Sequence, residues 1–168
     1  MTINIFIVQP MNRHIEEIQE ERVRIEYYIK RIYEWFQTER YTNPDINNKW
    51  RWMFPKIDCL DIQEKIEINV VNPIERQNVP RDTKQLWYLG QDIADLENCE
   101  LVIFSNDWER SSNCRIIREI VQRYGMASFS EGDIRSLAVR KEMYGWYPLF
   151  ERRKANEMRQ LPVMPYSR

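Results

Sequence analysis

One stretch of this chain, residues 85–126, constrains the fold more than any other. Leucine and isoleucine recur in its first part at steps of three and four, which predicts an amphipathic helix. An unbroken apolar run follows at residues 101–104, as is typical of a strand covered on both faces in a parallel sheet. A polar loop, residues 105–113, leads into a second helical pattern. The stretch predicts half of an α/β unit, with its ligand-binding loop at the carboxyl end of the strand.

The N-terminal residues predict a second unit of the same kind. Residues 3–8 form a short apolar run that fits a buried strand, and Pro10 should end it because proline has no N–H for a sheet ladder. Residues 15–36 show the apolar stripe of a long amphipathic helix, and Asn12 is placed to cap it. The pattern thus predicts an α/β fold with a parallel sheet of about four strands flanked by helices. The remaining elements are strands at 66–71 and 126–129 and a last helix at 134–144.

Composition excludes several classes of function. A net charge of −1 over 168 residues gives no general attraction to nucleic acid or to an anionic membrane. The three cysteines lie far apart without a CxxC pair, and His14 is the one histidine, so we expect neither a metal site nor a disulfide framework. There is no run of about 18 apolar residues, so we expect no membrane span. We therefore expect a cytoplasmic protein without a cofactor.

Two segments depart from the α/β pattern. Residues 38–63 are rich in Asn, Pro and aromatic residues, and we interpret them as an irregular insertion in a domain that spans 1–146. Its tryptophans, beside Lys49 and Arg51, would either stack on a base or cover the edge of the sheet. The tail, 147–168, is aromatic, basic and interrupted by proline. Such a tail docks on its own domain or on a neighbouring subunit, and we expect a homo-oligomer.

Two ordered blocks of sequence carry a resemblance to a known family. The first is FIVQPMN at residues 6–12, followed by the acidic start of a helix. The second is LWYLG at residues 86–90, followed by the strand, an Asp-Trp-Glu loop and NCRI at residues 113–116. Together they resemble the nucleoside 2-deoxyribosyltransferase-like proteins of phages and bacteria. The resemblance implies a flavodoxin-like, Rossmann-like fold that binds a nucleoside or nucleotide and cleaves or transfers its N-glycosidic bond, in the host cytoplasm if the chain is phage-encoded.

The catalytic group of that family is missing from its expected position. The resemblance implies a glutamate that attacks the anomeric carbon, two residues after the arginine that matches Arg115. Here that position is Ile117, which has no nucleophilic group. Glu119 lies two residues further and, at about 100° per residue, points to another side of the helix. Arg13 replaces the small residue that usually follows Pro-Met-Asn, and it would narrow the ligand mouth or add a cation there.

Three interpretations stay open. In an active enzyme, Glu109 in the loop or Asp92 on the preceding helix takes the place of the missing glutamate; the alternative for each is a solvated surface acid. Asp107 is a third candidate or a turn residue. In a catalytically lapsed homologue, the pocket binds a nucleotide-derived ligand without turning it over. In the third interpretation the fold serves as a structural or interaction protein.

The two loops supply the candidate ligand-binding residues. Backbone N–H groups at Ser112 and Asn113 would hold a phosphate, with Arg115 or Arg13 as its charge partner unless these arginines are only surface residues. The candidates are Gln9, Pro10, Met11, Asn12 and Arg13 after the first strand, and Trp108, Ser112, Asn113 and Arg115 after the strand at 101–104.

Overall fold

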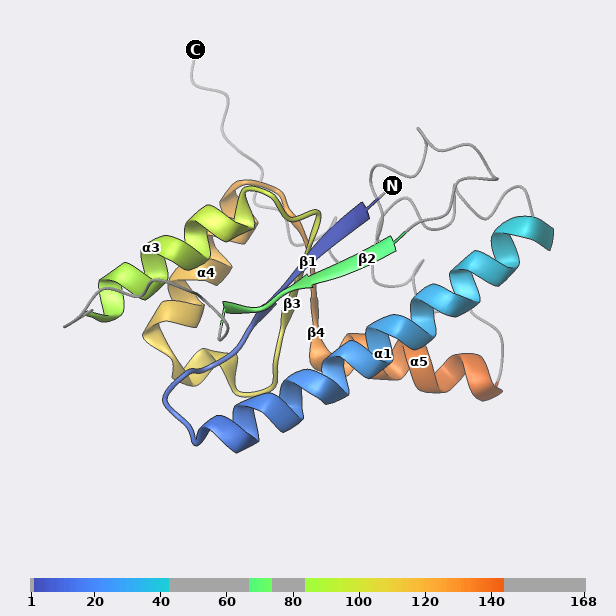
Figure 1. Cartoon of the computed structure of the whole chain (residues 1–168), viewed down its shortest axis with the longest axis horizontal. Helices are drawn as coiled ribbons and strands as arrows, with labels where there is room; N and C mark the ends of the chain where they lie inside the picture. Colours follow the sequence, from blue (N-terminus) through green and yellow to red (C-terminus); the bar gives the residue numbers. More distant parts are fainter. Residues whose placement is uncertain (1, 43–66, 74–83, 144–168) are drawn as a thin grey trace, which may run out of the picture.

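A four-stranded parallel sheet forms the centre of the molecule (Figure 1). The computed structural model describes residues 2–42, 67–73 and 84–143. The strands lie in the order β2-β1-β3-β4, and every neighbouring pair is parallel. Their bounds are Thr2–Val8 for β1, Glu67–Val71 for β2, Leu101–Phe104 for β3 and Ala127–Ser130 for β4.

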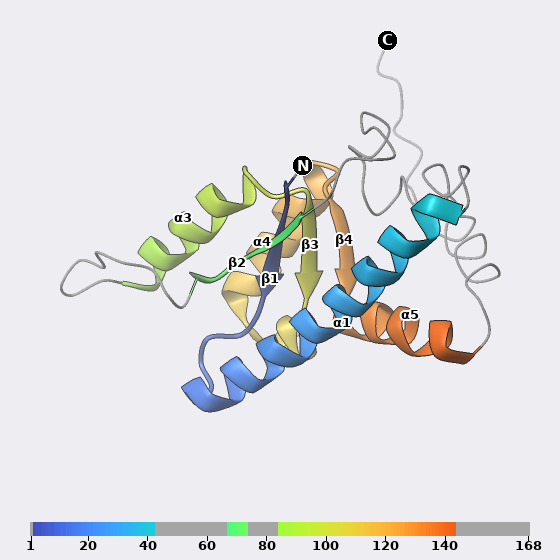
Figure 2. The same cartoon turned by 45° about the vertical axis from the view of Figure 1, so that its right-hand side comes forward.

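Four helices of the described residues cover the two faces of this sheet. One face carries α1 (Ile15–Thr42) and α5 (Glu131–Met143), and the other carries α3 (Gln85–Leu96) and α4 (Ser112–Arg123). Figure 2 shows the strands between these two layers. The arrangement is an α/β fold of the Rossmann or flavodoxin-like type, so the fold class expected from the sequence is confirmed.

The core lies in two layers because β1 and β3 bury side chains on both faces. In β1, Ile5 and Ile7 pack toward α1 and α5, whereas Phe6 and Val8 pack toward α3 and α4. This alternation follows from the two-residue period of a strand. All of β3 is buried, which confirms the prediction of a strand covered on both faces.

Two helix ends show how local sequence sets the boundaries. Gly125 follows α4 with φ of 65°, its N–H bonds the carbonyl of Gln122, and the N–H of Met126 bonds that of Val121. This is a Schellman motif, and it confirms the predicted C′ glycine. At α5, Ser130 and Asp133 exchange hydrogen bonds in a capping box. The helix therefore begins at Glu131, three residues before the predicted start at 134.

Several details of the helices differ from the prediction. The stripe expected on α3 included Leu86, which is 77% exposed, while Leu89 and Leu96 are buried. Figure 2 shows the N-terminal end of α3 lying away from the strands, which agrees with the exposure of Leu86. Asn12 does not cap α1, because the helix begins at Ile15 and the first carbonyl to accept is that of His14.

The expected insertion and tail fall mostly outside the described residues. The helix α1 continues to Thr42, so the first residues of the segment 38–63 are helical. Residues 43–66 and the tail 147–168, with the aromatic and basic residues noted there, lie outside the description. Within residues 2–42, 67–73 and 84–143, no helix combines the length and apolarity that a membrane crossing needs.

Candidate functional site: a pocket at the carboxyl edge of the sheet

A pocket of about 600 Å³ opens at the carboxyl ends of β1 and β3. These strands are neighbours, but the helices that follow them, α1 and α4, cover opposite faces of the sheet. The two loops therefore diverge and leave a crevice, as at the switch point of other open α/β sheets. The volume suits a ligand the size of a nucleoside or nucleotide.

The floor of the pocket is apolar. It is formed by Phe6, Ile7 and Val8 from β1 together with Cys114 and Ile117 from α4. Both α4 residues are 2% exposed and belong to the core on that face of the sheet. Ile117 is thus part of the pocket floor, at the position where the sequence resemblance implies a glutamate.

Polar side chains surround this floor. Asp92 comes from α3, Asn12 from the loop after β1, and Arg110 from the short 3₁₀ helix Trp108–Arg110. Among the described residues that line the pocket, Asp92 is the one carboxylate and Arg110 the one cationic side chain. The rim can therefore bind hydroxyl or amino groups and an anion, but it offers a single carboxylate to a reaction.

The N-terminus of α4 forms one side of the pocket. Ser111 caps the helix, because its Oγ accepts from the N–H of Cys114 at 3.4 Å and its carbonyl accepts from the N–H of Arg115 at 3.1 Å. The N–H groups of Ser112 and Asn113 precede the first intrahelical donor, and both residues line the pocket. These N–H groups and the helix dipole favour an anionic or carbonyl group of a ligand.

The thiol of Cys114 is buried in the pocket floor. Burial raises its pKa, and the nearby carboxylate of Asp92 raises it further, while the hydrogen bond with Ser111 and the charge of Arg13 oppose this rise. The thiol is therefore neutral near pH 7 and a weak nucleophile. The same interactions show that Asp92 and Arg13 lie within electrostatic range of the pocket floor.

Six residues proposed from the sequence come together around the pocket. These are Gln9, Met11, Asn12, Asp92, Ser112 and Asn113. They come from three separate segments of the chain. The expectation that the loops after residues 8 and 104 meet at one edge of the sheet is confirmed, since the N–H of Ser105 donates to the carbonyl of Val8 at 3.0 Å.

The other proposed residues lie elsewhere. Glu109 is exposed on the 3₁₀ helix and does not line the pocket. Arg115 is also exposed and outside the lining, and its Nη2 donates to Ser112 Oγ at 3.3 Å. Pro10 is buried beside Gln9 without reaching the pocket. Asp107 has φ of 62° and is exposed, so it is the turn residue that the sequence allowed.

Trp108 is partly buried against the core and does not line the pocket. The centroid of its ring lies 5.2 Å from that of Phe104. The guanidinium carbon of Arg118 lies 5.9 Å from the Trp108 centroid and 5.0 Å from the Phe104 centroid. This placement anchors the 3₁₀ helix against α4. Trp108 thus supports the loop that supplies Arg110.

Several lining residues were not proposed from the sequence. They include Gln85, Tyr88, Arg110, Ser111 and Cys114. A signal existed for two of them, because Gln85, Tyr88 and Asp92 recur at steps of three and four and therefore share one face of α3. No pattern in the sequence distinguishes Arg110 from other loop cations.

On the α1 side of the sheet, the same carboxyl edge is closed by two buried acids. Glu21 is 5% exposed; it accepts from Gln9 Nε2 at 3.0 Å and forms an ion pair with Arg13. Glu131 is 2% exposed; it accepts from the N–H of Asn106 at 3.0 Å and from Arg24 at 2.9 Å. The hydrogen bond between Arg24 and Glu131 raises the pKa of the Arg24 guanidinium. We call these six residues the edge network, which links α1, α5 and both loops.

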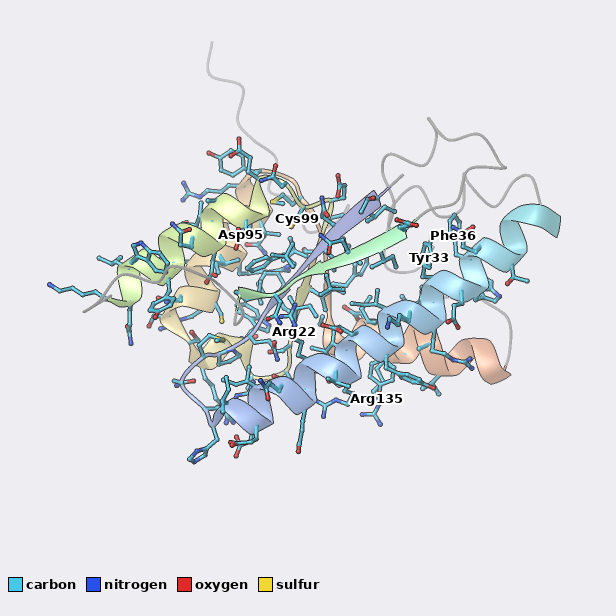
Figure 3. All side chains as sticks on the ribbon, in the orientation of Figure 1. Arg22, Tyr33, Phe36, Asp95, Cys99 and Arg135 are labelled. Atoms are coloured by element: carbon cyan, nitrogen blue, oxygen red, sulfur yellow. The ribbon has the colours of Figure 1, made fainter. Side chains whose placement is uncertain are left out.

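A second arginine of α1 fastens the neighbouring strand. Arg22 is buried between α1 and the sheet (Figure 3), and it donates to the carbonyl of Val71 at the end of β2. Its Nε lies 3.1 Å from Glu26. This contact fixes the edge strand to the helix and is separate from the pocket.

No protein-family model, curated protein or solved structure matches this chain. Function is therefore inferred from the pocket and from the residues that surround it.

Proposed function

We propose that the pocket binds a nucleoside or a nucleoside monophosphate and retains it without cleaving the N-glycosidic bond. The observation that carries the proposal is Ile117, a buried isoleucine in the pocket floor. It stands where the nucleophile of the resembled deoxyribosyltransferase-like family would lie. The ligand class follows from the resemblance of the loop sequences, and it is supported by a volume of about 600 Å³ at the sheet's switch point.

The lining offers a partner for each part of such a ligand. The apolar floor and the ring of Tyr88 favour a planar base. Asp92 and Asn12 can accept hydrogen bonds from sugar hydroxyls. Arg110 and the first N–H groups of α4 favour a phosphate. Arg110 therefore replaces Arg115 and Arg13 as the proposed charge partner.

The chemical groups of the pocket argue against the family's reaction. Glycosidic cleavage normally uses two carboxyl groups, one as nucleophile or base and the other as acid. Asp92 is the one carboxylate among the described lining residues. Cys114 is neutral because burial raises its pKa, and Glu109 lies outside the lining. A bound nucleoside would thus meet no complete catalytic pair among these residues.

Thermal unfolding with a panel of nucleosides and their 5′-monophosphates tests the proposal. At a ligand concentration of 100 times Kd, linkage stabilises the protein by about 2.7 kcal/mol. We expect at least one member to raise Tm and to be recovered intact by chromatography. Ribose 5-phosphate and inorganic phosphate are the controls for a general anion effect. A panel without any shift would refute binding.

Two arginine variants locate the phosphate. Arg110→Ala should weaken binding of a monophosphate by roughly tenfold and leave the matching nucleoside unchanged, because charge-assisted hydrogen bonds contribute about 1.5–3 kcal/mol and this one is exposed. Arg115→Ala is the matched control, since its side chain lies outside the pocket. An equal loss in both variants would contradict the assignment to Arg110.

A second candidate function is hydrolysis of the N-glycosidic bond with Asp92 as the carboxylate. The observation that favours it is the position of Asp92, which lines the pocket close enough to raise the pKa of Cys114 in the pocket floor. It predicts release of free base from a member of the panel, and Asp92→Asn should abolish that release while binding persists. Base release would replace the binding proposal with this one.

A further inference from the structure

Gln9 connects the pocket to the edge network. It follows β1 directly, is 7% exposed and lines the pocket. Its Nε2 donates to the carbonyl of Ile18 at 3.2 Å and to Glu21 Oε2 at 3.0 Å. An amide nitrogen has two N–H donors, so both are used inside the protein.

The orientation of this amide is fixed by the chemistry of its neighbours. A carbonyl and a carboxylate only accept hydrogen bonds, so a flipped amide would place Gln9 Oε1 against two acceptors. Glu21 is itself held in place, because Arg13 forms an ion pair with its Oε2 and Arg24 Nη2 lies 3.9 Å from its Oε1. Burial of this cluster makes an unpaired acceptor costly.

The amide oxygen of Gln9, Oε1, has no hydrogen-bond donor within the described part of the protein. It is also not one of the fully buried polar atoms that lack a partner in this part of the chain. The oxygen therefore reaches accessible space, and Gln9 borders the pocket.

We propose that Gln9 Oε1 is a fixed hydrogen-bond acceptor that selects ligands with an N–H or O–H donor at this point, and that Glu21 is the positioning residue that fixes its orientation. The inference rests on the proposed nucleoside-binding function. A sugar hydroxyl and an exocyclic amino group both supply such a donor. A phosphate or carbonyl oxygen does not, so a ligand phosphate lies at the Arg110 end of the pocket.

Binding titrations with adenosine and cytidine and with analogues that each lack one donor test the acceptor. The sugar arm uses the 2′-deoxy and 3′-deoxy nucleosides; the base arm uses purine riboside and the 4-deamino analogue of cytidine. The wild-type protein should bind a parent roughly threefold to tenfold more tightly than the analogue that lacks the donor facing Gln9. The arm in which this loss occurs identifies the donor as sugar or base.

Gln9→Met keeps the length of the side chain and removes the acceptor. We expect the variant to bind the parent nucleoside roughly threefold to tenfold more weakly and to bind that analogue with unchanged affinity. The ratio of parent affinity to analogue affinity should therefore fall to about one. An equal loss for parent and analogue would show a general effect on the fold and would overturn the proposal. An unchanged ratio would overturn it as well.

Glu21→Gln tests positioning without changing the pocket lining. The new amide can present its nitrogen to Gln9, so only the carbonyl of Ile18 still fixes the orientation of the Gln9 amide. The ratio of parent to analogue affinity should therefore fall to an intermediate value. Glu131→Gln is the matched control, because Glu131 is equally buried and also pairs with Arg24 but does not touch Gln9. A wild-type ratio in Glu21→Gln, or an equal fall in both variants, would refute the role of Glu21.

The outcomes separate this inference from the proposed function. If neither parent nor any analogue binds, the nucleoside proposal and this inference both fail. If nucleosides bind but the ratio does not depend on Gln9, only the inference fails. Melting temperatures of every variant without ligand show whether a lost ratio reflects lost folding.

Discussion

The carboxyl edge of the sheet is built in opposite ways on its two sides. Toward α3 and α4 it opens into a pocket with an apolar floor. Toward α1 and α5 the same edge is filled by the edge network around Glu21 and Glu131. Around Glu131 the edge is closed because α5 follows β4 directly and brings this acid to it, whereas residues 105–111 separate β3 from α4 and supply Arg110 and Ser111 to the pocket. Glu21 reaches the same edge from α1.

This comparison explains where charge is placed. On the closed side, carboxylates are buried because arginines and backbone N–H groups satisfy them. On the open side, Ile117 occupies the position where the sequence resemblance implies a catalytic glutamate, and apolar side chains surround it. Gln9 is the one described residue that belongs to both the edge network and the pocket lining. Four predictions test the contrast, from the largest expected effect to the smallest.

Ile117→Glu should have the largest effect. It places a carboxyl group in the apolar floor, and we expect a loss of about 4 kcal/mol in the free energy of unfolding at pH 7. Burial would raise the pKa of the new carboxyl, so the loss should shrink as pH falls toward 5 and the group becomes protonated. Urea denaturation at both pH values measures this, with Ile117→Gln as a pH-independent control. If Ile117→Glu caused little loss in the free energy of unfolding at either pH, the floor would already be polar or in contact with water.

Removal of a carboxylate should distinguish the two sides of the edge. Glu131→Leu removes the acceptor of the Asn106 N–H and the nearer of the two carboxylates beside Arg24, and should cost about 2–3 kcal/mol. Asp92→Asn, on the pocket side, should cost about 1 kcal/mol or less because ligand-facing groups contribute little to folding. Chemical denaturation without ligand compares them. Similar losses would remove the contrast between a structural and a ligand-facing acid.

The core on the pocket side should make the protein sensitive to alkali. Burial raises the pKa of the Cys99 thiol to about 12, and its Sγ donates to the carbonyl of Asp95 (Figure 3). The unfolded thiol titrates near about 8.5, so between these values only the unfolded state loses the proton. This contribution to stability is complete below about pH 8.5 and falls as pH rises toward 12, by about 1 kcal/mol per pH unit.

Cys99→Ala provides the measurement for that prediction. The variant should lose stability at neutral pH through the small cavity, but its free energy of unfolding should decline less steeply than that of the wild type above pH 9. The difference between the two pH profiles isolates the thiol from tyrosine and lysine titration. Parallel profiles would mean that the thiol is not shielded from water.

Helix capping should show the smallest contrast. At α5, Ser130 Oγ accepts from the N–H of Asp133 at 3.1 Å, and the Asp133 carboxylate accepts from the N–H of Ser130 in return. At α4, Ser111 Oγ accepts from the N–H of Cys114 at 3.4 Å in a single hydrogen bond. Ser130→Ala should therefore cost about 1 kcal/mol and Ser111→Ala about 0.5 kcal/mol. Thermal unfolding of the two variants resolves this difference. The reverse order would indicate that α4, on the pocket side, is the more firmly capped helix.

Much of the fold was readable from local patterns. The strand Leu101–Phe104 was predicted at its observed bounds because four consecutive apolar residues before a polar loop are typical of a short strand buried on both faces. Gly125 marked the end of α4, because glycine is the usual residue at the left-handed position after a helix, and it has a positive φ there. The start of α5 was missed although Ser130 and Asp133 have capping-box spacing, and Leu86 was wrongly placed in the core because periodicity does not reveal where a helix leaves the sheet.

The sequence by itself determined the α/β order, the parallel sheet and the edge where the loops meet, because hydrophobic period and turn residues act over a few positions. Only the tertiary structure decided which residues face the ligand. Asp92 and Glu109 were both candidates in the sequence, yet the first lines the pocket and the second lies outside it. Glu21 and Gln9 are twelve residues apart and share a hydrogen bond. Such choices depend on how helices pack across the sheet, and no local pattern encodes that distance.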